Sequence, residues 1–486
     1  MNRNTIVTGA RHIAVGSLLA IILILYLAPS KNHIADAITA SLLFVAVLLN
    51  GRLIVVAILP ALRPLLPLLV LLAYAFVLGF LRNGSASTGY ITSLAIGFLP
   101  YFLFYILFRD GRRAHFGILI IAIFIVPGFI HLALMYFDII SGILTGGVPF
   151  TSSSKQGLLE YVKNAPRVGR RYLSVVIVHF LFGSFLLRLI HNTPFVRYAT
   201  AALAVLSVFS LALLDARAAY VSLLLGALLT AVTLDYRILL PALVSWFPRR
   251  VWKRVMLAVA AAIIIAVGSN AGLSRWIAVR PSLDAAVYDV FQSSDDIGSR
   301  PYVNEAFWRQ PIPDVGKCYM DGDFRCKVDQ SAYLRVAWFL EGLKSIVEHP
   351  FGIGYSKDYM GRLWGVAGEV DRYQRIDGLL VELLVCFGLP GMVLYVAFWW
   401  RLGLALRQWQ RLPGKPAFPY MSDYMMILCG LIFVCVGRSL VDVFSDGLWG
   451  YLMAMVGMYY GLLHSELYDR NGPAIRGPQA VESGIR

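Results

Sequence analysis

The feature of this sequence that most limits its fold is a series of long apolar runs that recur along the chain. Many of them approach the roughly 20 residues that a helix needs to cross a bilayer. Charged residues are 15% of the chain and hydrophobic residues 58%, whereas about a quarter of residues are charged in soluble domains. Within lipid, an open chain satisfies its backbone polar groups only as helix. The sequence therefore predicts an all-α polytopic membrane protein.

The apolar runs predict about twelve transmembrane helices. They lie near residues 11–28, 34–50, 64–81, 90–108, 115–137, 171–190, 196–214, 216–234, 254–272, 379–403, 423–441 and 446–464. The first run has no small-x-small cleavage site at its end, so we interpret it as an uncleaved helix rather than a secretion signal.

These helices divide the chain into four parts. Residues 1–272 carry helices 1–9, with a loop on the far side of the membrane at about 138–170. Residues 273–378 form a large loop domain between helices 9 and 10, and residues 379–464 carry helices 10–12. Residues 465–486 are polar, and we expect a disordered tail.

Lys and Arg predict the orientation. Nearly all those in short loops fall on one side of a twelve-span chain, and the other side has only Lys31, Arg82, Arg217 and Arg438. Since cytoplasmic loops carry the excess of Lys and Arg, both termini are predicted to be cytoplasmic and both long loops to lie outside. Topology also explains much of the net charge of +15, so we expect no nucleic-acid partner.

Two of the five cysteines, Cys318 and Cys326, fall in the predicted outer domain. A disulfide between them is the favoured interpretation in an oxidising compartment. The three cysteines in predicted helices are interpreted as packing residues. No Cys or His group has metal-ligand spacing, so we expect no metal.

Charged residues gather at the outer ends of the predicted helices. Arg217 lies in a hinge between two helices, Arg438 lies near the end of another, and Asp377 and Glu382 open the helix after the loop domain. Charges at membrane depth are costly and often functional, which favours a site at the outer face. Alternatives remain open: an arginine can snorkel to lipid headgroups, and Asp377 can be a helix N-cap.

Three segments carry a more specific pattern. The first is Arg335-Val-Ala-Trp, followed by a stretch that ends in Pro-Phe-Gly352-Ile-Gly354-Tyr355. The second begins at Asp377-Gly and ends in Gly-Leu-Pro-Gly391, and the third is the hinge Asp-Ala-Arg217. Their order and sidedness resemble the O-antigen polymerase and O-antigen ligase superfamily, over roughly residues 200–400.

The resemblance implies a metal-independent, cofactor-free, inverting glycosyltransferase of the bacterial inner membrane, with its active site facing the periplasm. Its donor would be an oligosaccharide linked to undecaprenyl diphosphate. Polymerases of this superfamily transfer the glycan to the next repeat unit of O-antigen, capsule or exopolysaccharide, and a chain-length regulator is an expected partner. Ligases transfer it to lipid A core.

The resemblance favours a polymerase. Ligases and many polymerases carry His-Asn where this chain has Asp377-Gly. The O-antigen ligase remains the alternative within the superfamily. A transporter is the alternative of another class, but it predicts charges in the middle of helices and internal symmetry, and we find neither.

The resemblance also suggests roles for individual residues. Arg217 and Arg335 are the first candidates to stabilise the diphosphate leaving group, with Arg280 and Arg438 second. Asp377 is the candidate base for the acceptor hydroxyl, and Glu382 is the reserve.

Two further groups of residues are candidates for substrate binding. Gly352 and Gly354 either offer amides to phosphate or form a tight turn. Several aromatic residues either stack on sugar rings or fill the domain core: Tyr355, Tyr359, Trp364, Tyr302, Trp308 and Tyr333.

Overall fold

The computed structural model describes part of the chain, and the statements below concern that part. It comprises residues 21–22, 32–83, 91–92, 95–110, 126–144, 177–178, 180–181, 193–213, 225–226, 228, 279–293, 296–303, 328–356, 358–365, 379–411, 421–441 and 446–470. Regular structure within these ranges is helical throughout, which confirms the all-α class.

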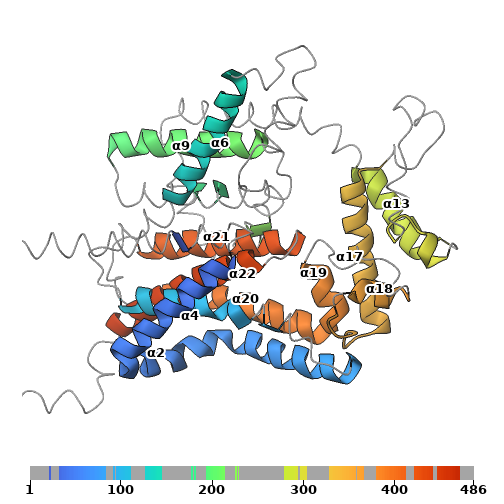
Figure 1. The fold of residues 1–486 in the computed structure, drawn as a ribbon, viewed down its shortest axis with the longest axis horizontal. Coiled ribbons are helices and arrows are strands. Elements are labelled where there is room, and N and C mark those ends of the chain that lie inside the picture. Colours follow the sequence, from blue (N-terminus) through green and yellow to red (C-terminus); the bar gives the residue numbers. More distant parts are fainter. Residues whose placement is uncertain are drawn as a thin grey trace, which may run out of the picture.

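The helices drawn in Figure 1 divide by sequence into those outside the predicted loop domain and those within it. Those of the first group are α2 (Asn32–Asn83), α4 (Phe98–Asp110), α6 (Val126–Leu144), α9 (Pro194–Leu213), α19 (Leu379–Glu382), the π-helical turn η6 (Leu383–Phe387), α20 (Gly388–Arg411), α21 (Met421–Val441) and α22 (Asp446–Arg470). Those of the predicted loop domain are α13 (Val279–Phe291), the short 3-10 helix η4 (Ile297–Ser299), α17 (Gln330–Glu348) and α18 (Tyr359–Leu363). The loop-domain helices lie at one end of the bundle formed by α2, α4, α20, α21 and α22.

Two helices are long and apolar enough to cross a membrane within the described ranges. They are Ile58–Arg82, with 25 residues, and Leu379–Trp409, with 31 residues. The predicted helices at 196–214, 423–441 and 446–464 are present as α9, α21 and α22. Most of the runs at 11–28, 171–190, 216–234 and 254–272 lie outside the described residues, as does most of the loop at 138–170.

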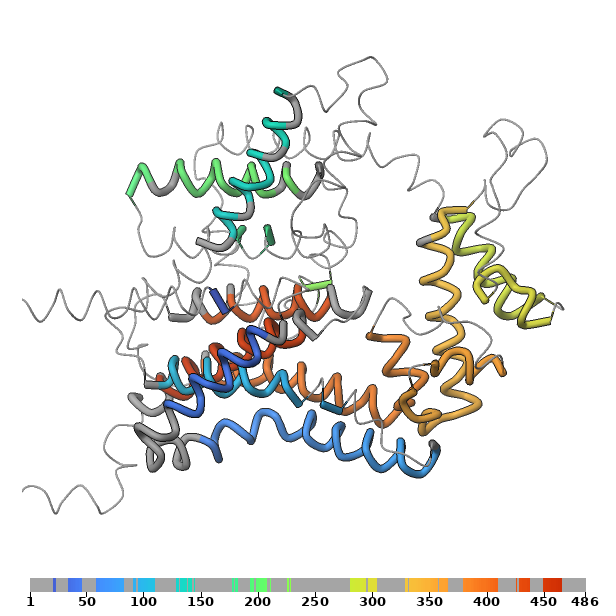
Figure 2. The backbone as a smooth tube through the Cα atoms, in the orientation of Figure 1, coloured from blue at the N-terminus to red at the C-terminus, as the bar shows by residue number. Residues whose placement is uncertain are grey.

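The boundaries near the N-terminus differ from the prediction. The runs at 34–50 and 64–81 belong to one helical element, α2, which contains Pro60, Pro64 and Pro67. Apolar surroundings favour a continuous hydrogen-bonded backbone, even through proline. The two apolar parts of α2, Ile34–Val45 and Ile58–Arg82, nevertheless run in different directions (Figure 2).

Two further predicted helices are described in part. The run at 90–108 contains helical residues at 91–92 and 95–96 and the helix α4 from Phe98 onward. The described part of the run at 115–137 belongs to α6, which continues beyond the predicted end to Leu144.

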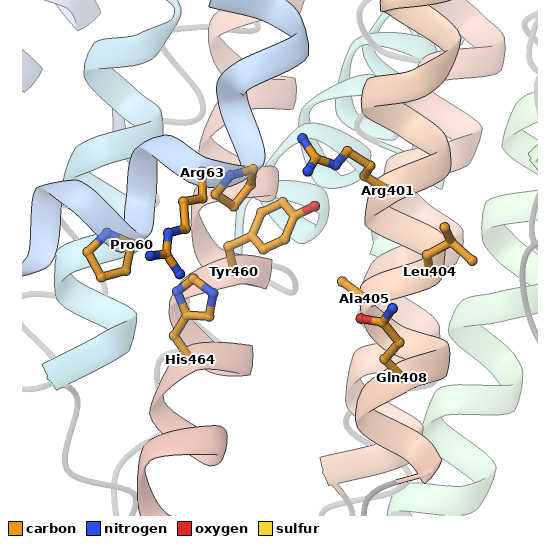
Figure 3. A pocket seen from close by; sticks show the side chains of 9 residues that line it. Pro60, Arg63, Arg401, Leu404, Ala405, Gln408, Tyr460 and His464 are labelled. Atoms are coloured by element: carbon orange, nitrogen blue, oxygen red, sulfur yellow. The ribbon is translucent and has the colours of Figure 1, made fainter. Parts of the chain in front are cut away.

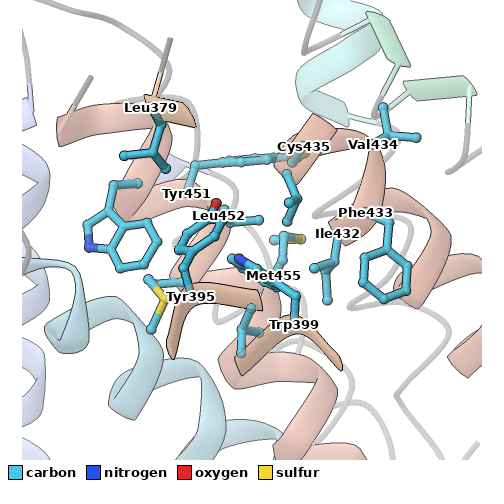
Figure 4. Close-up of a cluster of buried hydrophobic side chains, with 14 of the residues drawn as sticks. Leu379, Tyr395, Trp399, Ile432, Phe433, Val434, Cys435, Tyr451, Leu452 and Met455 are labelled. Atoms are coloured by element: carbon cyan, nitrogen blue, oxygen red, sulfur yellow. The ribbon is translucent and has the colours of Figure 1, made fainter. Parts of the chain in front are cut away.

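Helix α22 is the centre of the bundle. All its residues from Trp449 to Leu463 are buried, as expected for a helix that is apolar around its whole circumference. The start of α19 joins the same core, because Leu379 clusters with Tyr395 of α20, Cys435 of α21 and Tyr451 of α22 (Figure 4).

Glycines bring α22 into direct contact with the backbone of α4. A Cβ added to Gly457 would lie 2.2 Å from the carbonyl oxygen of Tyr101, and one added to Gly461 would lie 2.6 Å from that of Tyr105. The pair is a Gly-x-x-x-Gly pattern, which lets helices approach closely in apolar surroundings. Residue numbers rise in the same direction along both helices from the first contact to the second, so α4 and α22 are parallel.

Buried tyrosine hydroxyls connect the bundle helices. Tyr101 of α4 donates to the carbonyl of Ala61 in α2 at 2.8 Å, and Tyr459 of α22 donates to that of Leu402 in α20 at 2.9 Å. A buried hydroxyl without a partner is costly, so each bond favours one register between two helices.

We predict that Gly457→Ala destabilises the protein. The new methyl group would collide with backbone atoms of α4, which cannot move aside as a side chain can, and overpacking of this kind costs about 1–3 kcal/mol. The measurement is the apparent melting temperature of the purified protein in detergent, which should fall.

Gly342→Ala in α17 is the matched control. Its Cβ would meet only side-chain atoms of Leu384 and Val381, at 3.3 Å or more. A loss of melting temperature in Gly342→Ala as large as that in Gly457→Ala would contradict the close approach of α22 and α4.

Candidate functional site

The turn that follows α17 is hydrogen-bonded to the start of the long apolar helix. The N–H of Gly354 donates to the carbonyl of Cys386 at 3.0 Å, and the N–H of Leu389 donates to the carbonyl of Pro350 at 2.9 Å. Pro390, four residues after Cys386, has no N–H to offer that carbonyl within the helix. The turn supplies the missing donor, so the two segments are locked together.

Two glycines make this contact possible. Gly352 has a φ of 80° and Gly388 a φ of 59°, in the left-handed region that favours glycine. A Cβ on Gly352 would lie 2.4 Å from the Cys386 oxygen, and one on Gly388 would lie 2.3 Å from the Pro350 oxygen. Neither position therefore accepts a side chain without displacing backbone.

The amides of the turn are already bonded within the chain. The N–H of Gly352 donates to the carbonyl of His349 at 2.8 Å, and that of Gly354 donates to Cys386. This pattern supports the tight-turn alternative for Gly352 and Gly354 over the alternative in which their amides meet a phosphate.

The same turn is also fixed to α2. The hydroxyl of Tyr74 donates to the carbonyl of Phe351 at 2.5 Å. Close by, a Cβ on Gly391 of α20 would lie 3.6 Å from Leu71 of α2. The segments that the sequence pattern picks out at 350–355 and 388–391 therefore form one rigid junction with the bundle.

Helix α17 packs directly on the start of this junction. Gly342 faces Val381 and Leu384, since an added Cβ would lie 3.6 Å and 3.3 Å from their side chains. Arg335 lies seven residues earlier, on the same face of α17. It is half-buried and its Nε is buried. Arg335 therefore shares the face of α17 that contacts α19, about two helical turns before that contact.

Helix α18 places a tyrosine beside Glu382. The Tyr359 side chain is 3% exposed, and its buried hydroxyl makes no hydrogen bond to any described residue. Burial raises the pKa of Tyr359 well above its usual value, and the nearby carboxylate of Glu382 raises it further. The ring of half-buried Tyr355 lies 6.3 Å from that of Tyr359.

Together, Tyr355, Tyr359 and Glu382 form what we term the junction site, where the turn after α17, α18 and α19 meet. It combines a carboxylate with two phenols, and Arg335 lies about two helical turns along α17 from the contact with α19. A carboxylate in such a set can accept a proton from a hydroxyl. No three of the His, Cys, Asp and Glu side chains in the described ranges lie close enough together to hold a metal ion.

Other predicted site residues lie elsewhere or outside the described residues. Arg280 is in the first turn of α13, where its 90% exposed side chain pairs with Asp284 at 3.9 Å. Arg438 belongs to α21, but its side chain is outside the description. The remaining predictions that fall outside are Arg217, Asp377, Trp308 and the pair Cys318 and Cys326.

A buried polar network that sequence reasoning missed connects α13 and α17. Tyr302 donates to the carboxylate of Glu341 at 2.8 Å and accepts from Arg300 at 3.1 Å. Tyr333 of α17 donates to the carboxylate of Asp289 in α13. Nothing in the sequence marks these residues as partners, because they come from separate segments.

The aromatic residues divide clearly. Tyr302 and Tyr333 are 2% and 0% exposed, and Trp364 is 4% exposed. Together with Tyr359, these side chains fill the core of the loop domain, which supports that alternative over stacking on sugar rings. Tyr355 is left as a partly exposed candidate for stacking on a sugar ring.

We predict that two tyrosine substitutions in this domain differ in their effect on the free energy of unfolding. Tyr302→Phe should lower the free energy of unfolding by about 1–3 kcal/mol, because Glu341 is 3% exposed and loses its hydrogen-bond donor. Tyr359→Phe should leave it unchanged or raise it, since the lost hydroxyl has no bonded partner among the described residues. Thermal unfolding in detergent measures both, and equal losses would contradict the two environments.

We also predict that the loop domain loses stability at alkaline pH. Burial and the Asp289 carboxylate raise the pKa of Tyr333, and burial and Glu341 raise that of Tyr302. Both folded pKa values exceed the unfolded value of about 10. Their contribution is thus complete below pH 10 and is lost as pH rises toward the folded values.

The measurement is the apparent melting temperature between about pH 8 and 11, which spans the unfolded pKa. Tyr333→Phe should weaken the alkaline decline relative to the unmodified chain. An unchanged decline would show that these phenols do not control it.

No protein-family model matches this sequence, and no curated protein matches it at a significant level. The function must therefore be inferred from the residues and their geometry.

Proposed function

We propose that this chain is an integral membrane glycosyltransferase that polymerises a glycan carried on undecaprenyl diphosphate. The active site would lie around the junction site, at the periplasmic ends of about twelve spanning helices in a bacterial inner membrane. The single observation that carries the proposal is the set of backbone hydrogen bonds between the turn at 350–354 and residues 385–389. It joins two of the three segments on which the superfamily resemblance rests.

The arrangement of basic residues supports the proposed topology. Arg63, Arg109 and Arg401 come from three helices, and twelve spans assign all three to the cytoplasmic side. Arg63 and Arg401 line one pocket, and Arg63 and Arg109 lie within electrostatic range of His464. Tyr74, near the opposite end of α2, meets the loop domain instead. This separation of ends is what a bundle with a cytoplasmic and a periplasmic face requires.

The contact of Gly226 with α21 supports a shared role for Arg217 and Arg438. A Cβ on Gly226 would lie 2.4 Å from Val434 of α21. Gly226 belongs to the predicted helix at 216–234, and α21 is the helix that carries Arg438. A site that uses both arginines is consistent with this contact.

The proposed reaction needs a group that stabilises negative charge. The acceptor hydroxyl oxygen bonds to the donor's C1 as the bond from C1 to the phosphate oxygen breaks. The diphosphate leaves with the bonding electron pair and gains charge. Arg335 and Arg217 would stabilise that charge by fixed, bidentate hydrogen bonds.

A carboxylate would accept the proton of the acceptor hydroxyl. Asp377 is our first candidate, and it precedes α19 by two residues. Glu382 is the second, and it lies beside the buried phenol of Tyr359. Asp377 stands where the ligases carry histidine, which is why we propose a polymerase rather than a ligase.

We predict a ladder of glycan products when the purified chain is incubated with undecaprenyl-diphosphate repeat units in a chelating buffer. Arg335→Ala should lower the rate by about 10²–10³-fold, the usual cost of removing a stabilising donor. Asp377→Asn should lower it by about 10²–10⁴-fold, as expected for a general base. Products are separated on a gel and quantified.

Lys344→Gln is the matched control for Arg335→Ala. Lys344 is on the same helix, nine residues later and thus on the opposite face, where it pairs with Glu348 at 4.0 Å. Transfer only when lipid A core is added would identify a ligase. Donor binding without transfer to any acceptor would reject the enzyme and favour a transporter.

A further inference from the structure

A cavity of about 320 Å³ lies between α2, α20 and α22 (Figure 3), near the C-terminal end of α20 and thus away from the turn at 350–354 that bonds to the start of that helix. Arg63 of α2 forms one wall, Arg401 and Gln408 of α20 form the other, and Tyr460 and His464 of α22 lie between them. This volume is at the lower limit of small-ligand pockets. It suits a headgroup-sized ligand and is far too small for a glycan.

The cavity is strongly cationic. Arg63 and Arg401 both line it, and an arginine side chain keeps its charge at any physiological pH. The ion pairs between described residues include neither of them, and none of the residues that line the cavity is acidic. Arg109 adds a third charge within range of His464. Cations that lie this close together without acidic neighbours favour the binding of an anion.

The polar groups around the cavity are mostly hydrogen-bond donors. The Tyr460 hydroxyl is directed toward Arg401, and the Arg63 guanidinium extends toward the His464 ring (Figure 3). The hydroxyl of Tyr105 pairs with Nδ1 of His464 at 2.6 Å. That bond leaves Nε2 as the ring nitrogen that can meet a ligand. Guanidinium forks with a phenol and an imidazole match the oxygens of a phosphate.

We propose that this cavity binds a phosphate-bearing anion and so ties α2, α20 and α22 together at one membrane surface. The inference goes beyond the glycosyltransferase proposal and does not depend on it. Two sources share this chemistry: the headgroup of an anionic phospholipid and free phosphate. The basic ends of α2 and α20 are predicted to be cytoplasmic, where basic pockets between helices bind lipid headgroups.

The test uses the full chain, purified in a neutral detergent, and follows its apparent melting temperature by tryptophan fluorescence. One arm titrates short-chain phosphatidylglycerol, with short-chain phosphatidylcholine as the neutral comparison. The second arm titrates inorganic phosphate against chloride at equal ionic strength. A ligand that binds the folded state alone raises the melting temperature.

Arg63→Gln and Arg401→Gln should each weaken the apparent affinity by about tenfold or more, as expected from losing one charge-assisted bond. Arg401→Lys keeps the charge and should lose less. Arg82→Gln, an exposed cation at the other end of α2, is the control and should bind as the unmodified chain does.

Stabilisation by phosphatidylglycerol that depends on Arg63 and Arg401 supports a lipid headgroup site. The same dependence with inorganic phosphate alone supports a site for soluble phosphate. The proposal is overturned if neither compound stabilises the protein, or if both substitutions leave the stabilisation intact.

Discussion

The arrangement of the junction site depends on one backbone exchange between two distant segments. Pro390 removes the donor that the Cys386 carbonyl would otherwise have, and the positive φ of Gly388 turns the Leu389 amide toward Pro350. A buried backbone group without a partner costs free energy. The turn after α17 meets that need, and α17 and α18 are held against the start of α19 as a result.

Close helix packing gives the bundle two chemically different ends. Glycines of α22 allow backbone contact with α4, and tyrosine hydroxyls join α4 to α2 and α22 to α20. At one end the loop domain covers the bundle and Tyr74 bonds to it. At the other end Arg63 and Arg401 line an open cavity. The two proposed sites therefore belong to opposite ends of the same helices.

Much of the fold could be predicted, because hydropathy and helix length are local properties. The helices α9, α21 and α22 lie where the apolar runs predict. The boundary error at α2 has a local cause too, because helix continues through prolines in apolar surroundings. The site was predicted less well. The sequence pattern made Arg335 and Glu382 candidates, whereas the position of Tyr359 beside Glu382 depends on a contact between separate segments of the chain.

By itself, the sequence determined the helical class, the position of several helices and the distribution of charge, since each follows from residues near one another in the chain. Only the tertiary structure decided which hydrogen bonds chemically identical side chains make. Tyr302 and Tyr359 are both buried in the loop domain, yet one hydroxyl joins Arg300 to Glu341 and the other has no bond to a described residue. That difference depends on which distant backbone and side-chain groups the packing of α17 and α18 brings within hydrogen-bonding distance.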